Sequence, residues 1–460
     1  MIQTTKFAAS LSSINQAFLT KVNEESASQD KIKFDDLEHF NQYNYANVTL
    51  NPFPLFIDAK SKQLLAECTA QVIRLTVKMI REMVEENLEA TSAFYDMEPD
   101  ILKRIVDIDI ESQVLCRSDI VVNEDVMKVL ELNVSSNMGG WESSIYDQVY
   151  RSQAFIGDFL SEYPQVSVTD PIIQLIHSLK SAIDSVVSDG SQERRIAIFI
   201  SEDMMASSVI EFVNNRFVHA TDSLDCKLSV VFFSDETQLS FADDKVSLSD
   251  KAIHCLMLMG TTNPLSLEWK GREEILNAFF AGNLVLPDSP LHEVLNDKRN
   301  LALLLERCQT HFTAEERQQI QSYIPWSVQS NSQVCVYKGK EHVLKDLLLS
   351  AKDDFVLKLN ISHGGKDVYI GRSMDDDEWQ TVVLDAVKNA NYVAQEFCIP
   401  GCIHGLLNDQ IACFHPVWGI FSFSGSYSGV FVRMLTNDQF SSSGVVNTHN
   451  GAQETIVYEA

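Results

Sequence analysis

The sequence predicts a mixed α+β fold into which a doubly wound α/β unit is inserted. Apolar residues recur at the helical period over residues 63–88, which predicts a long amphipathic helix. Short β-rich runs alternate with helical segments between residues 195 and 287, which is typical of a parallel sheet. Residues 354–435 return to β-rich runs at hairpin-like spacing. We therefore expect several packed units along one chain.

Length and charge exclude several classes of protein. The chain has 460 residues, enough for two or three units with sizeable cores. Its 36 Lys and Arg residues stand against 64 Asp and Glu residues, and the resulting net charge of −28 disfavours nucleic acid and membranes as partners. No run approaches the ~20 apolar residues of a membrane span, and residues 1–19 lack the apolar core of a secretory signal. We expect a cytoplasmic protein that acts on small molecules, and a homodimer is compatible with these features.

Three units are predicted in chain order. Residues 1–165 form a helical region that contains one β-hairpin, residues 190–309 form a Rossmann-like α/β unit, and residues 310–460 form a unit of hairpin strands. The hairpin of the first unit has strands at residues 116–122 and 128–134, separated by a turn-forming Asn-Glu-Asp. It runs into a loop of small residues, Ser-Ser-Asn-Met-Gly-Gly, where chemistry could occur.

A lysine and a glycine pair in the third unit could bind a phosphate. Lys358 lies on a β-rich run, and Gly364 and Gly365 separate that run from the next one. Glycine lets backbone N–H groups approach phosphate oxygens, while a lysine supplies a positive charge. An ordinary β-hairpin with a Gly-Gly turn and a surface lysine explains the same pattern equally well.

Oxygen-bearing side chains gather on the hairpin of the first unit. Glu131 and Asn133 are alternate residues of one strand and therefore point to the same side. The partner strand can bring Asp119 opposite them. Two carboxylates and an amide oxygen suit Mg²⁺, although a solvated strand face with an ion pair to Arg117 is the simpler alternative. The adjacent small-residue loop favours a site.

A second metal hypothesis concerns cysteines. Nine scattered cysteines are typical of reduced thiols rather than of a disulfide framework. Cys398, Cys402 and Cys413 lie near His404 and His415, which is a possible zinc site. The three-residue spacer between Cys398 and Cys402 is not the usual one, so buried thiols are the preferred interpretation.

Four segments together resemble the circularly permuted ATP-grasp enzymes. Residues 355–371 and 376–397 resemble their nucleotide-binding half, while the hairpin with its small-residue loop resembles the metal-binding hairpin of eukaryotic glutathione synthetase and of glutathionylspermidine synthetase. Weaker likeness extends to residues 297–306 and 430–446. The metal hairpin precedes the nucleotide lysine here, as it does in the permuted proteins. The resemblance implies an ATP-grasp fold, with residues 310–460 as its nucleotide-binding part and the α/β unit as a substrate domain or lid.

The resemblance also implies roles for individual residues. Asp119, Glu131 and Asn133 match the ligands of magnesium, of which two ions are implied. The positions that match ATP-binding residues are Lys298, Lys358, Asn360, Gly364, Gly365, Gln395 and Glu396. Lys298 lies at the start of an amphipathic segment, where a solvated helix lysine is the alternative. Adenine is usually bound by backbone groups, so the side chains of Gln395 and Glu396 are the weaker assignments.

Substrate-binding positions are implied as well. Arg117 and Arg433 match cations that hold a substrate carboxylate or an acyl phosphate, and both count as catalytic. Ser136 falls where a serine contacts substrate. The segment Gly444, Val445 and Val446 resembles a mobile loop that closes over the product.

The chain departs from this pattern at four positions. Ser362 stands where glutathione synthetase has a glutamate, so Asn360 or a water has to complete the shell of the second metal. Leu359 replaces a proline, Asp367 replaces a glycine, and Leu435 replaces a nucleotide-contacting lysine. These changes argue against glutathione synthetase itself, whose substrate-recognition loop has no match here.

The expected activity is that of an ATP-dependent carboxylate–amine ligase. Attack of a carboxylate on the γ-phosphorus of ATP brings like charges together, so catalysis has to be mostly electrostatic. An amine then displaces phosphate from the acyl phosphate and leaves an amide. A catalytically silent nucleotide-binding module and a kinase that stops at the acyl phosphate are the alternatives.

Overall fold

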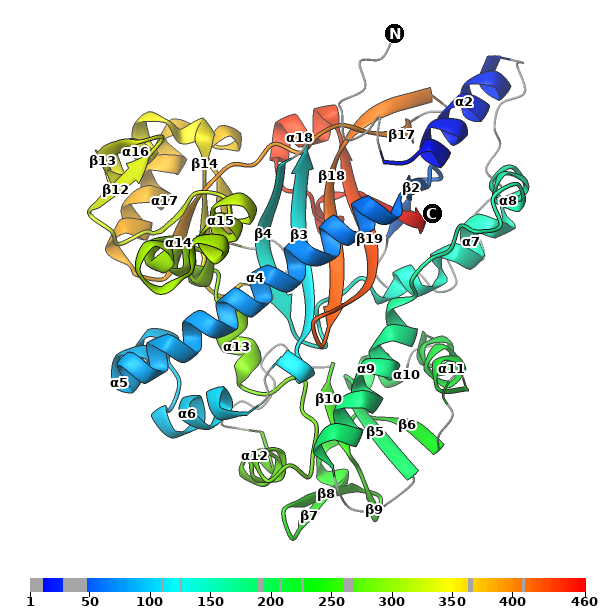
Figure 1. Ribbon diagram of the computed structural model, residues 1–460, viewed down its shortest axis with the longest axis vertical. Helices are drawn as coiled ribbons and strands as arrows, with labels where there is room; N and C mark the ends of the chain where they lie inside the picture. The colour runs from blue at the N-terminus through cyan, green and yellow to red at the C-terminus, as the bar shows by residue number, and fades with distance from the viewer. Residues whose placement is uncertain are drawn as a thin grey trace.

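The structure is a computed structural model of the chain. It describes residues 11–27, 48–108, 111–124, 126–187, 193–206, 209–222, 224, 227–259, 269–362, 367–407 and 410–460. Within these ranges helices combine with parallel, antiparallel and mixed sheets, which confirms the predicted α+β class (Figure 1).

A mixed sheet of eight strands forms the centre of the molecule. Its strand order is β1-β20-β19-β18-β3-β4, with β17 paired to β18 and β2 paired to β20. The strands are β1 (Thr49–Leu50), β2 (Leu55–Ile57), β3 (Leu115–Asn123), β4 (Val126–Val134), β17 (Ile403–Leu407), β18 (Gln410–Phe423), β19 (Ser426–Thr436) and β20 (Gln453–Glu459). The predicted hairpin of the first unit, β3–β4, thus shares a sheet with the last strands of the chain, because β18 pairs antiparallel with β3.

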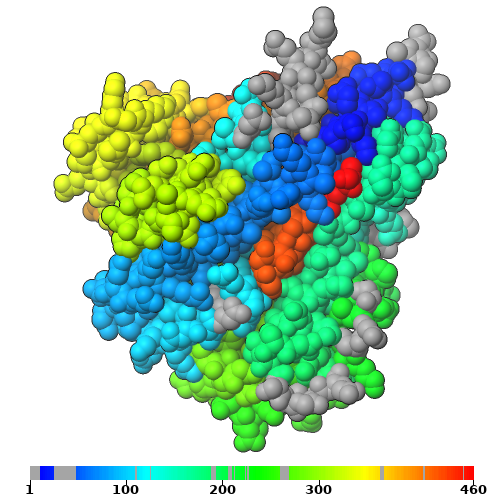
Figure 2. Space-filling model, in the orientation of Figure 1, coloured from blue at the N-terminus to red at the C-terminus, as the bar shows by residue number. Residues whose placement is uncertain are grey.

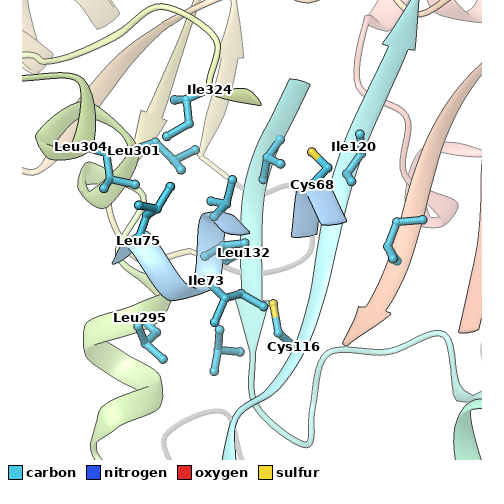
Figure 3. Packing of buried hydrophobic residues seen from close by; sticks show 14 of the residues in the cluster. Cys68, Ile73, Leu75, Cys116, Ile120, Leu132, Leu295, Leu301, Leu304 and Ile324 are labelled. Carbon is cyan, nitrogen blue, oxygen red and sulfur yellow. The ribbon is translucent and has the colours of Figure 1, made fainter. Parts of the chain in front are cut away.

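Helix α4 (Ala59–Glu86) crosses one face of this sheet and is a continuous blue band in Figure 2. Asp58 caps its first turn by accepting a hydrogen bond from the amide of Ser61. Its apolar stripe packs on β3 and β4, and Figure 3 shows Cys68, Ile73 and Leu75 of the helix beside Cys116, Ile120 and Leu132 of the strands. Each fully buried leucine of this stripe contributes about 2 kcal/mol.

The predicted helix over residues 63–88 corresponds to α4. The observed helix begins four residues earlier and ends two residues earlier than predicted. Asn87 has an extended backbone and ends α4. Its side chain accepts a hydrogen bond from the amide of Ala90 and thereby caps the next helix, α5 (Leu88–Tyr95). Apolar periodicity continues across this break, which is why the sequence pattern does not show it.

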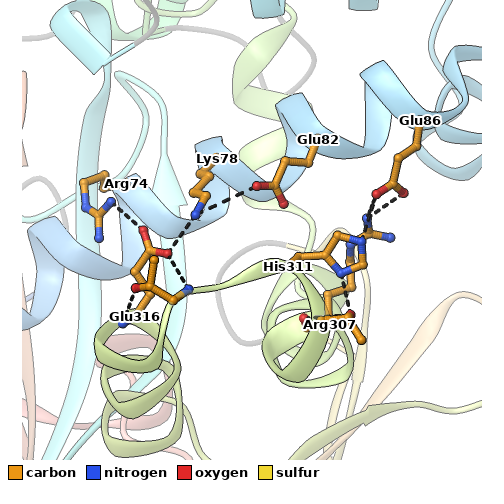
Figure 4. Close-up of polar contacts among 9 residues, drawn as sticks. Arg74, Lys78, Glu82, Glu86, Arg307, His311 and Glu316 are labelled. Carbon is orange, nitrogen blue, oxygen red and sulfur yellow. Dashed lines mark hydrogen bonds and ion pairs between the residues drawn. The ribbon is translucent and has the colours of Figure 1, made fainter.

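The outer face of α4 makes ion pairs with α14 (Arg299–His311) and α15 (Ala314–Tyr323), as Figure 4 shows. Arg74 and Lys78 contact Glu316 at 3.1 Å and 2.7 Å. Near the end of α4, Glu86 pairs with Arg307 at 2.6 Å and contacts His311 at 2.9 Å. These contacts fix the two later helices against the long one.

The middle of the chain contains the predicted parallel sheet. Its order is β10-β5-β6, formed by β5 (Glu193–Phe199), β6 (Lys227–Phe233) and β10 (Cys255–Leu258). The expected fourth strand at residues 283–287 adds a single parallel bridge between Cys255 and Val285. Three short antiparallel strands, which the sequence did not indicate, precede β10: β7 (Leu239–Ala242), β8 (Lys245–Leu248) and β9 (Lys251–Ala252). The helices around this sheet are α9 (Pro171–Val186), α10 (Glu202–Ala206), α11 (Val209–Asp222) and α12 (Arg272–Phe280).

Residues 327–396 form a separate four-stranded antiparallel sheet. Its order is β11-β16-β14-β15, with β11 (Ser327–Gln329), β14 (Phe355–Leu359), β15 (Val368–Ile370) and β16 (Tyr392–Glu396). A hairpin of β12 (Val334–Tyr337) and β13 (Lys340–Val343) lies beside it, with α16 (Leu344–Ser350) and α17 (Asp376–Lys388). Among the described residues, 310–460 therefore contribute to three sheets, which are the central sheet, the four-stranded sheet and the β12–β13 hairpin.

Shorter helices complete the described ranges. They are α2 (Ser13–Ala27), α6 (Pro99–Asp107), α7 (Tyr146–Ser152), α8 (Ala154–Ser161), α13 (Leu291–Asn296) and α18 (Asn437–Ser443). Single 3-10 turns are η1 (Glu111–Gln113), η2 (Trp141–Ile145), η3 (Glu236–Gln238), η4 (Lys352–Asp354), η5 (Gly371–Ser373) and η6 (Thr448–Asn450). Across the described ranges, no helix combines the length and the apolar character that crossing a bilayer requires.

Candidate active site

A cleft of about 940 Å³, including the solvent space at its mouth, is lined by residues of the central sheet and of the four-stranded sheet. Most residues predicted for the site line it: Arg117, Asp119, Glu131, Asn133, Lys298, Lys358, Gln395, Glu396, Arg433, Gly444, Val445 and Val446. Segments far apart in the sequence therefore meet at one place.

The register of the β3–β4 hairpin brings the predicted oxygen donors together. Asp119 lies directly opposite Glu131, and Arg117 lies opposite Asn133. The register then shifts, because Ile120 pairs with Val129 and Leu130 is left without a cross-strand partner. This bulge turns the carbonyl of Leu130 toward the other sheet.

Lys358 on β14 is bound to that bulge. Its Nζ donates to the carbonyl oxygen of Leu130 at 3.1 Å, and its side chain is buried. Burial lowers the pKa of Lys358, whereas the nearby carboxylate of Glu131 acts in the opposite direction. The amide of Gln395 on β16 donates to the same carbonyl at 3.5 Å and to the hydroxyl of Ser327 at 3.2 Å. Its amide therefore joins the two sheets.

Lys298 reaches the cleft from the start of α14. Its Nζ lies 3.9 Å from Oε2 of Glu131 and donates to the carbonyl of Ser362 at 3.0 Å. Its backbone amide donates to the carbonyl of Asn360 at 2.9 Å. The residue is 8% exposed, so it is not the solvated helix lysine that was the alternative.

Asp119 holds two arginines. Its Oδ1 lies 3.2 Å from Nε of Arg117 and 2.7 Å from Nη2 of Arg433. Burial by itself would raise the pKa of Asp119, but the two guanidinium groups lower it to about 2. The ring of Phe431 lies 5.6 Å from each guanidinium carbon and completes the cluster.

A glycine makes room for this cluster. Gly419 on β18 lies opposite Asp119, and a Cβ atom there would be 2.6 Å from the ring of Phe431 and 3.2 Å from the side chain of Arg117. The sequence offers no signal for this requirement, because the pairing of β18 with β3 is long-range.

The segment after α18 forms another wall of the cleft. Gly444 ends this helix in a left-handed conformation with φ of 65°, and its amide donates to the carbonyl of Phe440 at 2.9 Å. Val446 is buried against Phe440 and Val417. The predicted loop thus lies at the cleft, with Asn447 as an additional lining residue.

Four predicted residues lie elsewhere or are not described. Ser136 is fully buried outside the cleft, where its hydroxyl donates to Oδ2 of Asp288 at 2.6 Å and its amide to Oδ1 at 2.7 Å. The side-chain amide of Asn360 donates to Oδ2 of Asp297 at 3.5 Å, and Asn360 is not among the residues that line the cleft. Gly364 and Gly365 lie outside the described residues.

The cysteine hypothesis is changed by the structure. Cys402 and Cys413 form a disulfide, because the β17–β18 hairpin brings their Cα atoms to 5.6 Å. The expectation that all cysteines are reduced thiols is therefore wrong for this pair. Burial raises the pKa of Cys398 to about 11, which keeps its thiol protonated. In the part of the chain that the structure describes, no three His, Cys, Asp or Glu residues are placed to hold a metal.

The donor set on the hairpin can still be compared with the needs of Mg²⁺. The shortest contacts of both guanidinium groups with Asp119 are to Oδ1. Glu131 faces the cleft, and Asn133 uses its amide nitrogen to donate to the carbonyl of Arg117 at 3.2 Å. Two carboxylates and an amide on two adjacent strands are the types of ligand that Mg²⁺ takes alongside phosphate and water.

Comparisons with known proteins bear on the fold. Neither a protein-family model nor a curated protein sequence matches the chain. Among solved structures, a glutathione synthetase-like effector from Globodera pallida in its apo form superposes with a TM-score of 0.56 over 97% of each chain. The two proteins share a fold. Their sequences are 13% identical, so the similarity concerns the fold alone.

A second solved structure is less similar. It comes from Methylobacillus flagellatus and carries the description gamma-glutamylcysteine synthetase, with 11% identity over 80% of this chain and 83% of that one. Its TM-score of 0.39 is too low to carry an argument.

Proposed function

We propose that this protein is an ATP-dependent carboxylate–amine ligase of the circularly permuted ATP-grasp type. The observation that supports it is the meeting of Lys298, Lys358 and the Asp119–Glu131 pair around one cleft, although they come from three separate segments. Two ammonium groups beside two carboxylates suit a triphosphate with its magnesium. The shared fold with a glutathione synthetase-like protein agrees with this class.

The lysines would bind the phosphates of ATP. Lys358 is held by the carbonyl of Leu130 and Lys298 by that of Ser362, so both ammonium groups are positioned before a ligand arrives. Preorganised charges in a site with little water stabilise transferred phosphoryl groups more than mobile surface lysines do. The apolar walls formed by Val356, Ile370 and Phe397 suit the base and ribose.

The arginine pair would bind the acid substrate. Arg433 has a buried Nε without a hydrogen-bond partner among the described residues, so an incoming carboxylate can supply one. The substrate oxygen forms a bond to the γ-phosphorus while the bond to ADP breaks. The amine nitrogen then forms a bond to the acyl carbon, phosphate leaves, and the nitrogen loses a proton.

Asp119, Glu131 and Asn133 are the residues that would hold Mg²⁺. The ion would neutralise phosphate charge and orient the phosphates. A second Mg²⁺ ion is also proposed. Ser362 stands where the glutamate ligand would be, so no side chain is assigned to that ion. Exclusion of water from the acyl phosphate would depend on closure of residues 444–447 over the cleft.

Small carboxylates and amines are the proposed partners, and a cytoplasmic location and a homodimer remain part of the proposal. The proposal is tested by incubating the protein with Mg²⁺, ATP and pools of amino acids and polyamines, measuring ADP, and identifying the product by mass. We expect ADP and a product that has lost one water relative to its two parents. The proposal would be contradicted if none of the pools caused the protein to form ADP.

A catalytically silent nucleotide-binding protein is the second candidate. Leu435, which replaces a lysine of the related enzymes, is fully buried among Val121, Val417 and Phe440 and supplies no charge. Such a protein would bind ATP without forming ADP. A third outcome, trapping of a hydroxamate by hydroxylamine without an amide product, would indicate a carboxylate kinase.

A further inference from the structure

Glu454 is a buried carboxylate behind the arginine pair. It lies on β20, 1% exposed, directly opposite Arg433 of β19. Its Oε2 accepts a hydrogen bond from the hydroxyl of Tyr146 at 2.5 Å, and its Oε1 accepts one from the hydroxyl of Thr448 at 2.7 Å. A carboxylate that loses water on burial needs such partners to remain charged.

Thr448 connects this carboxylate to the wall of the cleft. It begins η6, directly after the cleft-lining residues 444–447. The amides of Asn450 and Ala452 donate to the carbonyl of Asn447, and that of Gly451 donates to the carbonyl of Thr448. Residues 447–452 therefore form a small hydrogen-bonded unit.

The segment before this unit has few anchors of its own. Within the described residues, neither Val445 nor Val446 donates a backbone hydrogen bond. The hydroxyl of Thr448 is one polar contact between this wall and the buried strand β20.

The same carboxylate faces the substrate-binding cation. Arg433 lies between Asp119, at 2.7 Å, and its cross-strand neighbour Glu454. The cluster therefore contains two guanidinium groups, those of Arg117 and Arg433. Two carboxylates, those of Asp119 and Glu454, offset their charge. Without the Glu454 carboxylate, Asp119 would be the carboxylate that attracts Arg433. The guanidinium group could then move with Asp119.

We propose that Glu454 is a positioning residue that orients Arg433 toward the cleft and, through Thr448, holds residues 444–448 against it. We call the contacts of Glu454 with Arg433 and, through Thr448, with residues 444–448 the clamp. The clamp is inferred from contacts within the unliganded chain. Its consequence for the acid substrate rests on the proposed function. One carboxylate would then couple the cation that binds the acid to the loop that covers it.

The clamp is tested on the unliganded full chain by hydrogen exchange and mass spectrometry of peptides that cover residues 444–452. Thr448→Val removes the hydroxyl, and we expect the bonded amides of residues 450–452 to exchange about tenfold faster or more, as loss of a hydrogen bond to a charged group implies. Thr448→Ser keeps the hydroxyl and should exchange as the parent does. Tyr146→Phe is the matched control, because it removes the other hydrogen bond to the same carboxylate without releasing the loop.

Equal exchange in Thr448→Val and the parent would overturn the proposal, as would equal acceleration by Thr448→Val and Tyr146→Phe. In the ADP assay, Glu454→Gln should raise the KM of the acid about tenfold and change the KM of ATP less than about twofold, which a general loss of stability would not do. Equal changes in both constants would also overturn it. Faster exchange in a chain that forms no ADP would support the clamp while contradicting the proposed ligase activity.

Discussion

Substitution of Asp119 by asparagine should destabilise the protein through its two buried arginines. A pKa lowered from its usual 3.8 to about 2 corresponds to roughly 2 kcal/mol of stabilising interaction. Because the pKa is depressed, this stability is present in full above pH 3.8 and is lost as the pH falls toward 2. At pH 7 the Asp119→Asn change should therefore cost roughly 2 kcal/mol or more, since Arg117 and Arg433 remain buried and lose the carboxylate that both of them contact.

The assay is urea-induced unfolding at pH 7 without magnesium, followed by tryptophan fluorescence. Asp147→Asn is the control, because Asp147 makes a similar ion pair to Arg151 at 2.7 Å that is largely exposed. Such a pair contributes at most about 1 kcal/mol. The double variant Asp119→Asn, Arg433→Met should lose less than the sum of its two single variants. Additive losses, or equal losses for Asp119→Asn and Asp147→Asn, would refute the electrostatic account.

Three further predictions concern other parts of the fold. Contacts with Lys78 and Arg74 lower the pKa of Glu316 to about 2, against the opposing effect of burial. Glu316→Gln should therefore lower the free energy of unfolding at pH 7, and the difference between variant and parent should vanish near pH 2. Gly419→Ala should cost about 1–3 kcal/mol by overpacking against Phe431 and Arg117, measured by the same unfolding assay. Cys402→Ser frees the thiol of Cys413, so thiol titration under denaturing conditions should count one thiol more than in the unreduced parent, whereas reduction of the parent should add two.

Local pattern was sufficient for the hairpin and for its oxygen donors. Strand alternation put Glu131 and Asn133 on one side, and a partner strand of the hairpin was expected to be able to bring Asp119 opposite them; Asp119 lies opposite Glu131 in the observed register. The predicted parallel strands and the long helix follow from the same kind of local signal. These features depend on residues close in sequence.

Long-range pairing could not be predicted in this way. The pairing of β18 with β3 creates the Asp119–Arg433 contact and the need for Gly419, and nothing near these residues in sequence indicates it. The bulge at Leu130 that receives Lys358 is likewise invisible in the alternation. Glu454 lies two residues before the apolar pair Ile456 and Val457 of β20, and an acidic residue on such a strand is a local signal of a buried charge.

Most residues that the family resemblance matched line the cleft, whereas Ser136 and Asn360 do not. Ser136 occupies the expected stretch of chain, yet its hydroxyl is committed to Asp288. Lys298 would have been taken for a solvated residue from its helix alone, and its burial beside Glu131 depends on the contact between α14 and the hairpin. Ser136 and Lys298 thus differ from their expected environments because of the direction of their side chains, which position in the chain does not determine.

The central claim is that two lysines from distant segments bind one nucleotide. Calorimetric titration of ATP with Mg²⁺ into the parent, Lys358→Met and Lys298→Met tests it directly. Lys128→Met is the control, because Lys128 also donates to backbone carbonyls, those of Gln321 and Ile324 at 3.0 Å, but does not line the cleft. We predict that each cleft lysine variant weakens binding about tenfold or more while Lys128→Met binds as the parent does. Unchanged affinity in either cleft variant, or an equal loss in all three, would contradict the claim.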